Sequence, residues 1–495
     1  MLKATGVLHR YFLLGESSPD LFGGFVEHMG RSVYGGLYEK GHVSSDEEGF
    51  RGDVLALVRE LSMPVMRYPG GNFVSAYDWR SGIGPKEHRR PHFDPAWGET
   101  ESNEFALDEF CSWCAKAGTE PALAMNLGTG TEEMALALFD YCNGDGGDVW
   151  SKKRKQYASE KPYKVRYFFL GNEMSSPRQI GHKSAEEYGT FAADIARKLK
   201  EKDPSCRLVL SGSSCRGAAS YGYWDETVLE KAYEETDLLS LHAYFGPKGE
   251  DLASFLASDL VLDAHIEEVT ALCDAVAAKK KSKKKLFLSL DEWNIWSGTN
   301  RAFVPGVPDF EDVYTALDAV TLGGLFMSIL SHCSRLKLAC LAQTCNILAP
   351  IMTRTGGGAW KQTIFHPFAL TSRYGRGKVL QSNFSSPENC RTPSGETCPA
   401  CRLCAVFHEK EKLLALFLLN RAWEEESSFS VELGGFAPEK VLETFLLSAE
   451  DPGAVNEEGK ERVAPRRAEK FQLKGNLFSA VLPARSWALF LVQVK

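Results

Sequence analysis

Residues 165–172 have the sequence Val-Arg-Tyr-Phe-Phe-Leu-Gly-Asn, a short apolar run with little polar alternation. Such runs are typical of parallel strands that are buried on both faces. Residues 185–201 follow with apolar side chains at helical spacing, and Ser184 with Glu187 has the form of a capping box. The segment therefore predicts one strand–loop–helix unit.

The same unit recurs between residues 22 and 373. The predicted helices include 53–61, 104–117, 132–142 and 185–201, and the eight predicted strands are 22–29, 65–71, 121–127, 165–172, 207–212, 238–244, 286–293 and 338–346. This alternation predicts an α/β fold, a (β/α)₈ TIM barrel with loop insertions. A doubly wound open sheet is the alternative, although the chain lacks the glycine-rich first turn of nucleotide-binding sheets.

The pattern changes after residue 377. Strand-like segments without an intervening helical pattern are predicted at 378–384, 403–409, 413–420, 429–433, 440–447 and 478–492. They are typical of an all-β sandwich, here jelly-roll-like. Residues 3–14 also form a predicted strand that belongs to no βα unit, and we expect it to pair with this sandwich. The predicted domains are a barrel, 18–373, and a β-sandwich built from 1–17 and 374–495.

The composition excludes several functional classes. The 495 residues include 57 Lys and Arg against 65 Asp and Glu, a net charge of −8, which argues against a nucleic-acid partner. No stretch approaches the ~20 apolar residues that span a bilayer, and the first ten residues lack the apolar core of a signal peptide. The odd count of 13 cysteines favours a reducing compartment, so we expect a cytoplasmic protein.

Four of these cysteines form a cluster, Cys390, Cys398, Cys401 and Cys404. Four thiolates can bind a structural Zn²⁺ ion. The spacing matches no zinc module, however, and we favour free thiols over a metal site.

Polar residues at the ends of predicted strands indicate where the chemistry lies, because the carboxyl ends of barrel strands converge. The fourth strand is followed by Asn172 and Glu173, and the seventh contains Asp291 and Glu292. Two acids that converge on one pocket are what glycoside hydrolysis requires: one protonates the leaving oxygen, while the other attacks the anomeric carbon or activates water. Successive strand residues face opposite sides, so we expect only one of Asp291 and Glu292 to face the pocket. The spacing alone does not select between them.

Several sequence blocks, taken in order, resemble the α-L-arabinofuranosidases of glycoside hydrolase family 51. They are FGGFVEHMGR at 22–31, RYPGGNF at 67–73, TESNEF at 100–105, YCNG at 141–144, LGNEM at 170–174, QIGH at 179–182, HAY at 242–244, DEWN at 291–294, AQ at 342–343 and NILAPIM at 346–352. The resemblance implies a (β/α)₈ barrel with a sandwich built from both termini. It also implies an exo-acting, retaining enzyme that releases terminal arabinofuranosyl residues from arabinan or arabinoxylan oligosaccharides by double displacement, without a cofactor or metal. It further implies a homo-oligomer, commonly a hexamer.

The resemblance also assigns roles to individual residues. Glu173 matches the general acid/base, and Glu292, rather than Asp291, matches the nucleophile. The residues implied to bind substrate are Glu27, Asn72, Asn172 and Gln343 at the sugar hydroxyls, His242 and Tyr244 in the pocket lining, and Trp97 as a packing surface. Arg67 and Tyr244 are expected to keep the nucleophile ionised.

Two departures from the family pattern concern the part of the substrate that leaves. The chain has Ser176-Pro177-Arg178-Gln179 where the family usually has Gly-Pro-Trp-Gln, and the sixth strand lacks an Asn and a second Tyr. The preference for the leaving group therefore stays open. The alternatives are a retaining endoglucanase or β-xylosidase on the same scaffold, and a non-catalytic sugar-binding protein.

Overall fold

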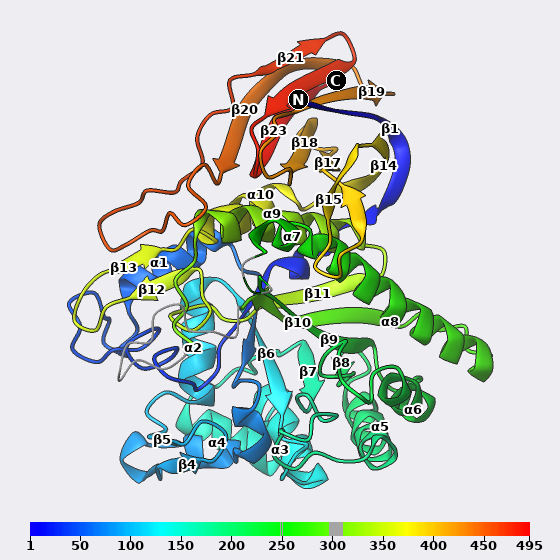
Figure 1. Ribbon diagram of the computed structural model, residues 1–495. Coiled ribbons are helices and arrows are strands. Elements are labelled where there is room, and N and C mark those ends of the chain that lie inside the picture. Colours follow the sequence, from blue (N-terminus) through cyan, green and yellow to red (C-terminus); the bar gives the residue numbers. More distant parts are fainter. Residues whose placement is uncertain (248, 250, 297–309) are drawn as a thin grey trace.

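The computed structural model describes residues 1–247, 249, 251–296 and 310–495. Its centre is a closed barrel of parallel strands in the order β10-β11-β2-β3-β6-β7-β8-β9 (Figure 1). The barrel strands are β2 (Gly23–Phe25), β3 (Val65–Tyr68), β6 (Glu120–Met125), β7 (Tyr167–Leu170), β8 (Arg207–Leu210), β9 (Leu238–Phe245), β10 (Phe287–Ile295) and β11 (Leu336–Leu341). Each lies on one of the eight predicted strands. The prediction of a barrel is therefore confirmed, and the alternative of a doubly wound open sheet is wrong.

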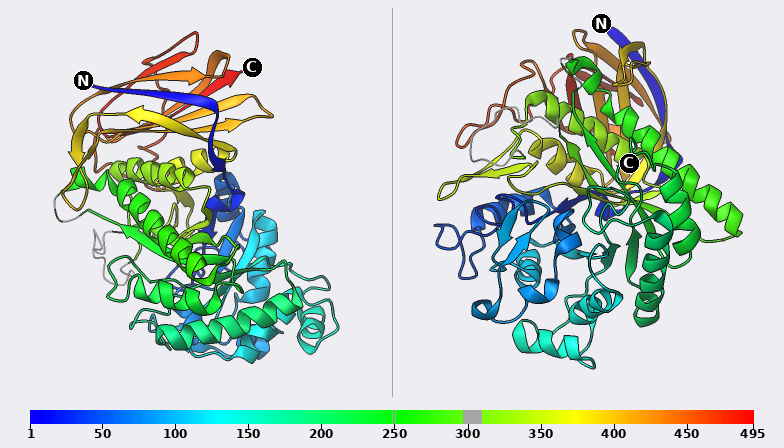
Figure 2. Two further views of the ribbon diagram at one scale, coloured as in Figure 1. Left: turned by 90° about the vertical axis from the view of Figure 1, so that its right-hand side faces the viewer. Right: turned by 60° about the horizontal axis from the view of Figure 1, so that its bottom comes forward.

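Helices surround the barrel (Figures 1 and 2). They are α1 (Gly52–Leu61), α2 (Leu107–Ala117), α3 (Glu132–Asn143), α4 (Val149–Tyr157), α5 (Ala185–Lys202), α6 (Tyr223–Ala232), α7 (Leu252–Phe255), α8 (Ser258–Lys280), α9 (Ala316–Ser331) and α10 (Phe365–Tyr374), with short 3₁₀ helices η1 (Pro19–Phe22), η2 (Phe73–Ala76), η3 (Trp79–Gly82) and η4 (Lys86–His88). The predicted capping box of Ser184 and Glu187 begins α5.

Helix α9 is the most apolar of these helices, because both of its sides are covered. It packs on the barrel and on strands of the second sheet (Figure 1). A Cβ at Gly323 would lie 2.6 Å from the Trp487 ring, so only glycine permits this close approach. Among the described residues, no helix has the length and apolarity needed to cross a bilayer.

The second unit is a nine-stranded sheet in the order β20-β23-β18-β17-β14-β1-β19-β22-β21. Its strands are β1 (Leu2–Glu16), β14 (Lys378–Ser385), β17 (Cys401–His408), β18 (Leu413–Asn420), β19 (Ser427–Gly434), β20 (Pro438–Ser448), β21 (Phe471–Lys474), β22 (Leu477–Leu482) and β23 (Ser486–Val494). Strand β1 runs antiparallel to β14 and parallel to β19, as expected for the opening segment (Figure 2). The Phe478 and Phe490 rings, from β22 and β23, lie 5.1 Å apart, so the sheet folds over into two layers.

One strand prediction in this unit is wrong. The segment 478–492 is not continuous, because β22 ends at Leu482 and β23 begins at Ser486. Pro483 has no backbone N–H for a ladder hydrogen bond, and Arg485 adopts a φ of +48°. The chain therefore turns here, and two strands form where one was predicted.

Three small hairpins complete the chain: β4 (His92–Asp94) with β5 (Glu99–Glu101), β12 (Ile351–Thr353) with β13 (Ala359–Lys361), and β15 (Glu388–Arg391) with β16 (Thr397–Pro399). Cys390 faces Cys398 across the last of these, while Cys401 and Cys404 lie on β17. All four are free thiols. Within the described residues, the cysteines form no group with metal-binding geometry, so nothing there supports the zinc alternative.

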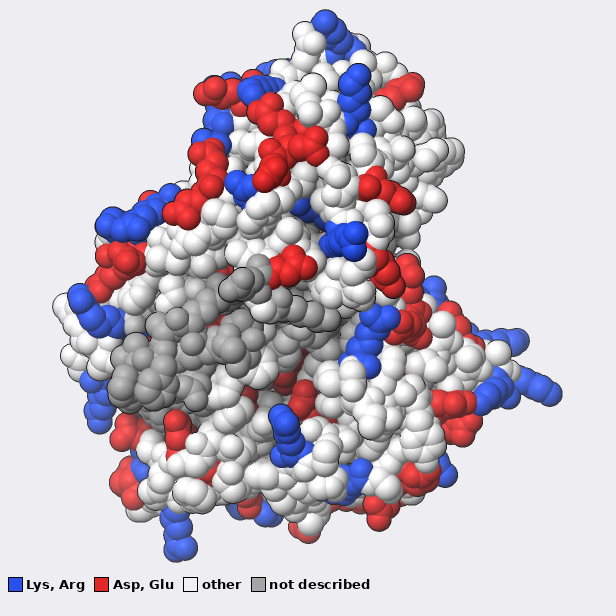
Figure 3. All heavy atoms as spheres, viewed as in Figure 1, with Lys and Arg blue, Asp and Glu red and all other residues white. Residues whose placement is uncertain are grey.

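Charged residues are mixed on the face that Figure 3 displays, where Lys and Arg lie among Asp and Glu. Across the described part of that face, no continuous basic area is visible.

A buried ion network joins the two units. Arg402 on β17 donates to Asp259 and Asp263 of α8, with both Nη1–O distances 2.7 Å. Arg421, beyond β18, donates to the same Asp259 oxygen at 2.6 Å. Asp259 is 1 % exposed, so its charge depends on these two guanidinium groups for compensation.

We expect Arg402→Met to destabilise the protein by about 3 kcal/mol, because it removes one of the two guanidinium partners of the buried Asp259 and leaves the half-buried Asp263 without its arginine. The free energy of unfolding can be measured by denaturant titration. Arg466→Met is the control, because Arg466 pairs with Glu450 on the surface and its loss should cost no more than about 1 kcal/mol. Equal losses for both variants would contradict this role of the network.

Candidate active site

The two predicted catalytic glutamates lie together where barrel strands end. One oxygen of Glu173, one ring nitrogen of His242 and one oxygen of Glu292 all lie within 4.8 Å of one another. Retaining glycosidases hold their two carboxyl groups about 5 Å apart, whereas inverting enzymes leave room for a water molecule between them. The separation is that of a retaining pair.

Glu173 follows β7 in a sharp turn. Gly171 has a φ of +86° and Glu173 itself a φ of +44°, a conformation that is uncommon for residues other than glycine. The side chain of Glu173 is 23 % exposed, and its Oε1 lies 2.9 Å from Nδ1 of His242 on β9. The turn therefore places a partly accessible carboxyl group beside a buried imidazole.

Glu292 lies in an irregular part of β10. Ser289 pairs with Ser240 of β9, and the next pair is Glu292 with His242, so β10 holds one extra residue between these pairs. The same offset occurs against β11. This is a β-bulge, and it changes the expected alternation of side chains.

Because of the bulge, Asp291 and Glu292 both face the barrel interior, although regular strand alternation would turn one of them outward. Both contact the same two side chains: Asp291 Oδ2 lies 3.5 Å from Arg67 Nε and 3.5 Å from His242 Nε2, and Glu292 contacts Arg67 and His242 as well. Glu292 is 7 % exposed and Asp291 1 %. Both acids therefore face inward, with Asp291 behind the catalytic pair.

Arg67, at the end of β3, organises these acids. Its guanidinium donates through Nη1 to Glu292 Oε1 and through Nη2 to Asn172 Oδ1, both at 2.7 Å. The group is fully buried between the rings of Phe25 and Phe169, 4.7 and 4.8 Å from their centroids. Burial disfavours the charge, but Asp291 and Glu292 outweigh it and raise the pKa of Arg67.

Both oxygens of Glu292 accept hydrogen bonds. Arg67 donates to Oε1, and the Tyr244 hydroxyl donates to Oε2 at 3.0 Å. Burial, followed by the charge of Glu292, raises the pKa of Tyr244 well above its usual value, so this hydroxyl stays a donor. Such bonds stabilise an ionised carboxylate and fix its orientation, as a nucleophile requires.

His242 carries a charge in this setting. Burial lowers its pKa, but Glu292, Asp291 and Glu173 outweigh burial and raise the pKa to about 10. A doubly protonated imidazole has no lone pair to offer a metal. The donor atoms of Glu173, His242 and Glu292 are close enough for a metal ion, but the charge on His242 argues against one at neutral pH.

Gly71, in the loop after β3, lies against polar atoms of the site. A Cβ there would lie 2.9 Å from Glu292 Oε1, 3.3 Å from Asn172 Nδ2 and 3.4 Å from Glu27 Oε2, so a larger side chain would crowd the nucleophile. Because Arg67 already holds Asn172 Oδ1, the amide Nδ2 is the end that faces Gly71. The half-buried Asn72, next in the chain, makes no capping bond to η2, so its amide is available to a ligand.

Glu27, two residues after β2, lies against the same glycine. Its Oε1 accepts hydrogen bonds from the Phe73 backbone N–H at 3.0 Å and from Trp97 Nε1 at 3.1 Å. Burial, followed by the charge of Glu292, raises the pKa of Glu27 to about 8. At neutral pH Glu27 is therefore a neutral acid, which can donate a hydrogen bond through Oε2.

Gln343 lies behind Glu27 rather than beside Gly71. Its Oε1 accepts from the Glu27 backbone N–H at 3.1 Å and from Ser32 Oγ at 3.0 Å, and its Nε2 lies 3.6 Å from Met29 Sδ. In this structure its side-chain oxygen supports Glu27. The sequence reasoning placed Gln343 at the sugar instead.

Aromatic side chains line the rim of the site. Trp97, Tyr244, Trp296 and Phe310 pack together over Met29, Ile347 and Leu348. The Trp97 and Phe310 centroids are 5.6 Å apart, and those of Tyr244 and Trp296 are 5.7 Å apart. Such a rim offers apolar surface to the faces of a sugar ring. Sequence reasoning missed Phe310, which no motif marks, and Gly71, although the Gly70-Gly71 pair after a barrel strand was a signal.

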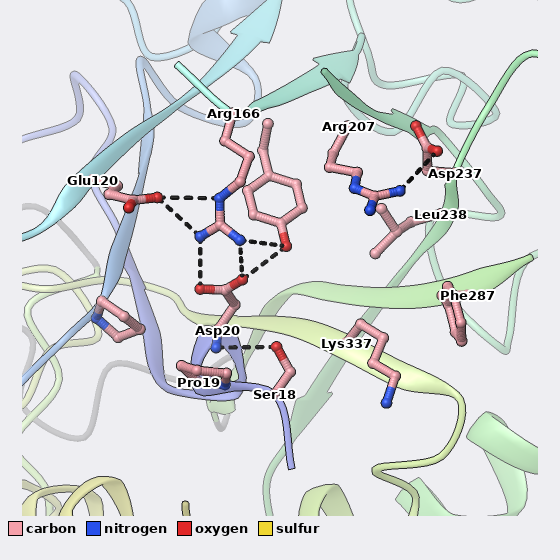
Figure 4. Close-up of a pocket in the computed structure, with 12 residues that line it drawn as sticks. Ser18, Pro19, Asp20, Glu120, Arg166, Arg207, Asp237, Leu238, Phe287 and Lys337 are labelled. Atoms are coloured by element: carbon pink, nitrogen blue, oxygen red, sulfur yellow. Dashed lines mark hydrogen bonds and ion pairs between the residues drawn. The ribbon is translucent and has the colours of Figure 1, made fainter. Parts of the chain in front are cut away.

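A separate cavity of about 490 Å³ lies at the opposite end of the barrel, where the strands begin (Figure 4). Arg166 pairs there with Asp20 at 2.8 Å and with Glu120 at 2.9 Å, and Arg207 pairs with Asp237 at 3.3 Å. These charges neutralise one another. Residues at this end of a barrel usually serve stability, and we assign the cavity no catalytic part.

Comparisons with known proteins agree with this geometry. The family model described as "Alpha-L-arabinofuranosidase 1 domain" matches residues 57–249, and the model described as "Alpha-L-arabinofuranosidase C-terminal domain" matches residues 291–486. The chain is 41 % identical, over 98 % of both chains, to "Intracellular exo-alpha-(1->5)-L-arabinofuranosidase 1" of Bacillus subtilis. It is 42 % identical to "Exo-alpha-(1->6)-L-arabinofuranosidase" of Bifidobacterium longum, over 91 % of this chain and 88 % of that one.

The solved structure of AbfB, a family 51 α-L-arabinofuranosidase from Bifidobacterium longum, superposes with a TM-score of 0.94. The two chains are 37 % identical, and the match covers 99 % of each.

The pKa of Glu27 predicts a pH dependence of stability. A carboxyl group that titrates near 4.5 when unfolded and near 8 when folded stabilises the fold fully below pH 4.5 and loses this effect as the pH rises through 8. Glu27→Gln keeps a neutral side chain at every pH. We therefore expect the wild-type unfolding midpoint to fall relative to the variant between about pH 5 and 9. Parallel midpoint curves would show that Glu27 is ionised in the folded protein.

Proposed function

Because the chain belongs to the α-L-arabinofuranosidases of glycoside hydrolase family 51, we propose a retaining mechanism in which Glu173 is the general acid/base and Glu292 the nucleophile. The protein is an exo-α-L-arabinofuranosidase, as its curated relatives are. The observation that carries the mechanism is the presence of Glu173 and Glu292 oxygens within 4.8 Å of each other.

In the first step, Glu173 gives its proton to the glycosidic oxygen as Glu292 attacks the anomeric carbon. The C–O bond to the leaving sugar breaks, and an arabinosyl ester of Glu292 forms. Glu173, now a carboxylate, then takes a proton from water as the water attacks the same carbon, which regenerates both acids. Arg67 and Tyr244 hold Glu292 in place throughout, since they bind its two oxygens.

In this proposal the arabinose ring binds at Glu292, with Gly71 beside it. Glu27, Asn72 and the Nδ2 of Asn172 bind its hydroxyls, His242 and Tyr244 line the pocket, and Trp97 packs against the ring. Gln343 does not bind the sugar directly but supports Glu27 by accepting a hydrogen bond from its backbone N–H. Substrates are arabinan and arabinoxylan oligosaccharides.

Three further features complete the proposal. The domains are 18–373 and 1–17 with 374–495. The protein acts inside the cell, since several relatives are named intracellular. By family resemblance it assembles as a homo-oligomer, commonly a hexamer, which sedimentation analysis tests.

A panel of nitrophenyl glycosides tests the substrate class. We expect release from the α-L-arabinofuranoside at least about 100-fold faster than from the β-D-xyloside or from cello-oligosaccharides, because the pocket's polar groups are unpaired with the wrong sugar. Faster release from the β-D-xyloside would favour the β-xylosidase alternative. Binding without turnover of any glycoside would favour a sugar-binding protein.

The roles of the two glutamates predict different rescue products. Glu173→Ala should lose about 10² to 10⁴ in kcat on unactivated substrates and, with azide, form an α-configured arabinosyl azide from the covalent intermediate. Glu292→Ala lacks that intermediate, so azide should attack directly and give the β-azide. NMR of the products distinguishes the two. Glu201→Ala, on the exposed side of α5, is the control and should behave as wild type. Exchanged products would reverse the two roles.

A further inference from the structure

Asp291 is an acid that the proposed mechanism does not use, yet it contacts the residues that hold both catalytic glutamates. It is 1 % exposed, and its Oδ2 lies 3.5 Å from both Arg67 Nε and His242 Nε2. Burial opposes ionisation of Asp291, but Arg67 and His242 outweigh burial and hold its pKa below the usual range. Asp291 is therefore a buried negative charge directly behind the site.

The bulge in β10 is what gives Asp291 this position. In a regular strand, the residue before Glu292 would face the surrounding helices. The extra residue between Ser289 and Glu292 turns Asp291 inward instead. A buried charge is costly unless it is paired, and the partners of Asp291, Arg67 and His242, lie inside the barrel.

His242 lies between Asp291 and the catalytic acids. Its Nδ1 is 2.9 Å from Glu173 Oε1 and 3.5 Å from Glu292 Oε2, while Nε2 faces Asp291. With carboxylates at both ring nitrogens, the imidazole carries two protons. The Tyr244 hydroxyl, on the same strand, stays protonated. His265 on α8 stays neutral, because burial, Arg216 and His242 lower its pKa to about 4.

We propose that Asp291 is a positioning residue whose negative charge holds a proton on each ring nitrogen of His242, so that Nδ1–H supplies the proton which Glu173 delivers to the leaving group. This inference rests on the proposed role of Glu173. The unit is a chain of three residues, Asp291, His242 and Glu173. It differs from the direct contacts of Arg67 and Tyr244, which serve the nucleophile.

The proton balance needs no additional reactant. Nδ1 of the imidazolium gives its proton to the Glu173 carboxylate, which leaves a neutral imidazole and a carboxylic acid. Glu173 passes this proton to the glycosidic oxygen while Glu292 forms its bond to the anomeric carbon. In the second step Glu173 takes a proton from the attacking water and returns one to Nδ1. Asp291 keeps its charge throughout and stabilises the imidazolium at both ends of the cycle.

Asp291→Asn tests the proposal, because it keeps the shape and removes the charge. We compare an arabino-oligosaccharide, whose leaving alcohol needs a proton, with a dinitrophenyl arabinofuranoside, whose phenolate leaves without one. We expect kcat to fall about 10- to 100-fold on the oligosaccharide and less than about threefold on the dinitrophenyl substrate, with KM nearly unchanged. The alkaline limb of the pH profile should move to lower pH, because His242 loses its proton earlier without the charge of Asp291.

Double variants and a matched control separate this role from a structural one. In a Glu173→Ala background, Asp291→Asn should cause little further loss on the oligosaccharide, because both act on one proton. Asp108→Asn removes another buried carboxyl group, which accepts hydrogen bonds from Tyr141 and Tyr163. That control should lower the unfolding midpoint and leave the ratio of the two substrate rates unchanged.

Two outcomes would overturn the proposal. One is an equal loss on both substrates with an unmoved alkaline limb, which would mean that Asp291 acts on the nucleophile or on folding. If Asp291→Asn does not fold, His242→Asn is measured instead. The second contradicting outcome is then an equal loss of kcat for His242→Asn on the oligosaccharide and on the dinitrophenyl substrate. Failure of the proposed function gives a different result. In that case Glu173→Ala itself would lose the same kcat on both substrates.

Discussion

One buried cation, the guanidinium of Arg67, holds the acids of the site in place. It lies between two phenylalanine rings with no access to water, and it contacts Glu292, Asn172 and Asp291. A charge in this position is unfavourable unless it is paired. Glu292 and Asn172 accept hydrogen bonds from the two terminal nitrogens, and the charge of Asp291 lies 3.5 Å from Nε. The barrel thus brings three segments that are distant in sequence, at Arg67, Asn172 and the Asp291–Glu292 pair, to one point.

The barrel was predictable because its strands are buried on both faces and its helices on one. A strand buried on both faces is a continuous apolar run, whereas a helix buried on one face has apolar residues at helical spacing. A run such as Val165 to Asn172 can therefore be recognised as a strand from the local sequence alone. The position of Glu173 at a strand end followed from the same pattern. Its role did not, because an acid at a strand end can equally cap a helix. The roles of Glu173 and Glu292 came from resemblance, and the geometry is in agreement with them.

What the sequence could not reveal is the local departure from regularity. The alternation rule allows one inward residue of Asp291 and Glu292, and the bulge in β10 supplies two. A bulge has no strong sequence signature when the residues involved are not glycine. Gln343 is a similar case, since its type predicts hydrogen bonding but not whether the partner is a sugar or the Glu27 backbone. The split of 478–492 at Pro483 has a cause in the sequence, because proline cannot donate a ladder hydrogen bond.

Strand β1 lies in the middle of its sheet, between β14 and β19, although some 360 residues of chain separate β1 from β14. During translation at about 5–20 residues per second, β1 leaves the ribosome roughly 20 to 70 s before β14 is made. The barrel can complete itself during that interval, but the sheet cannot. Ala4 and Leu8, which are 1 % and 0 % exposed in the finished fold, therefore stay uncovered on the nascent chain during that time. Strand β1 completes its pairing only after β14 and β19, its two neighbours, have been made.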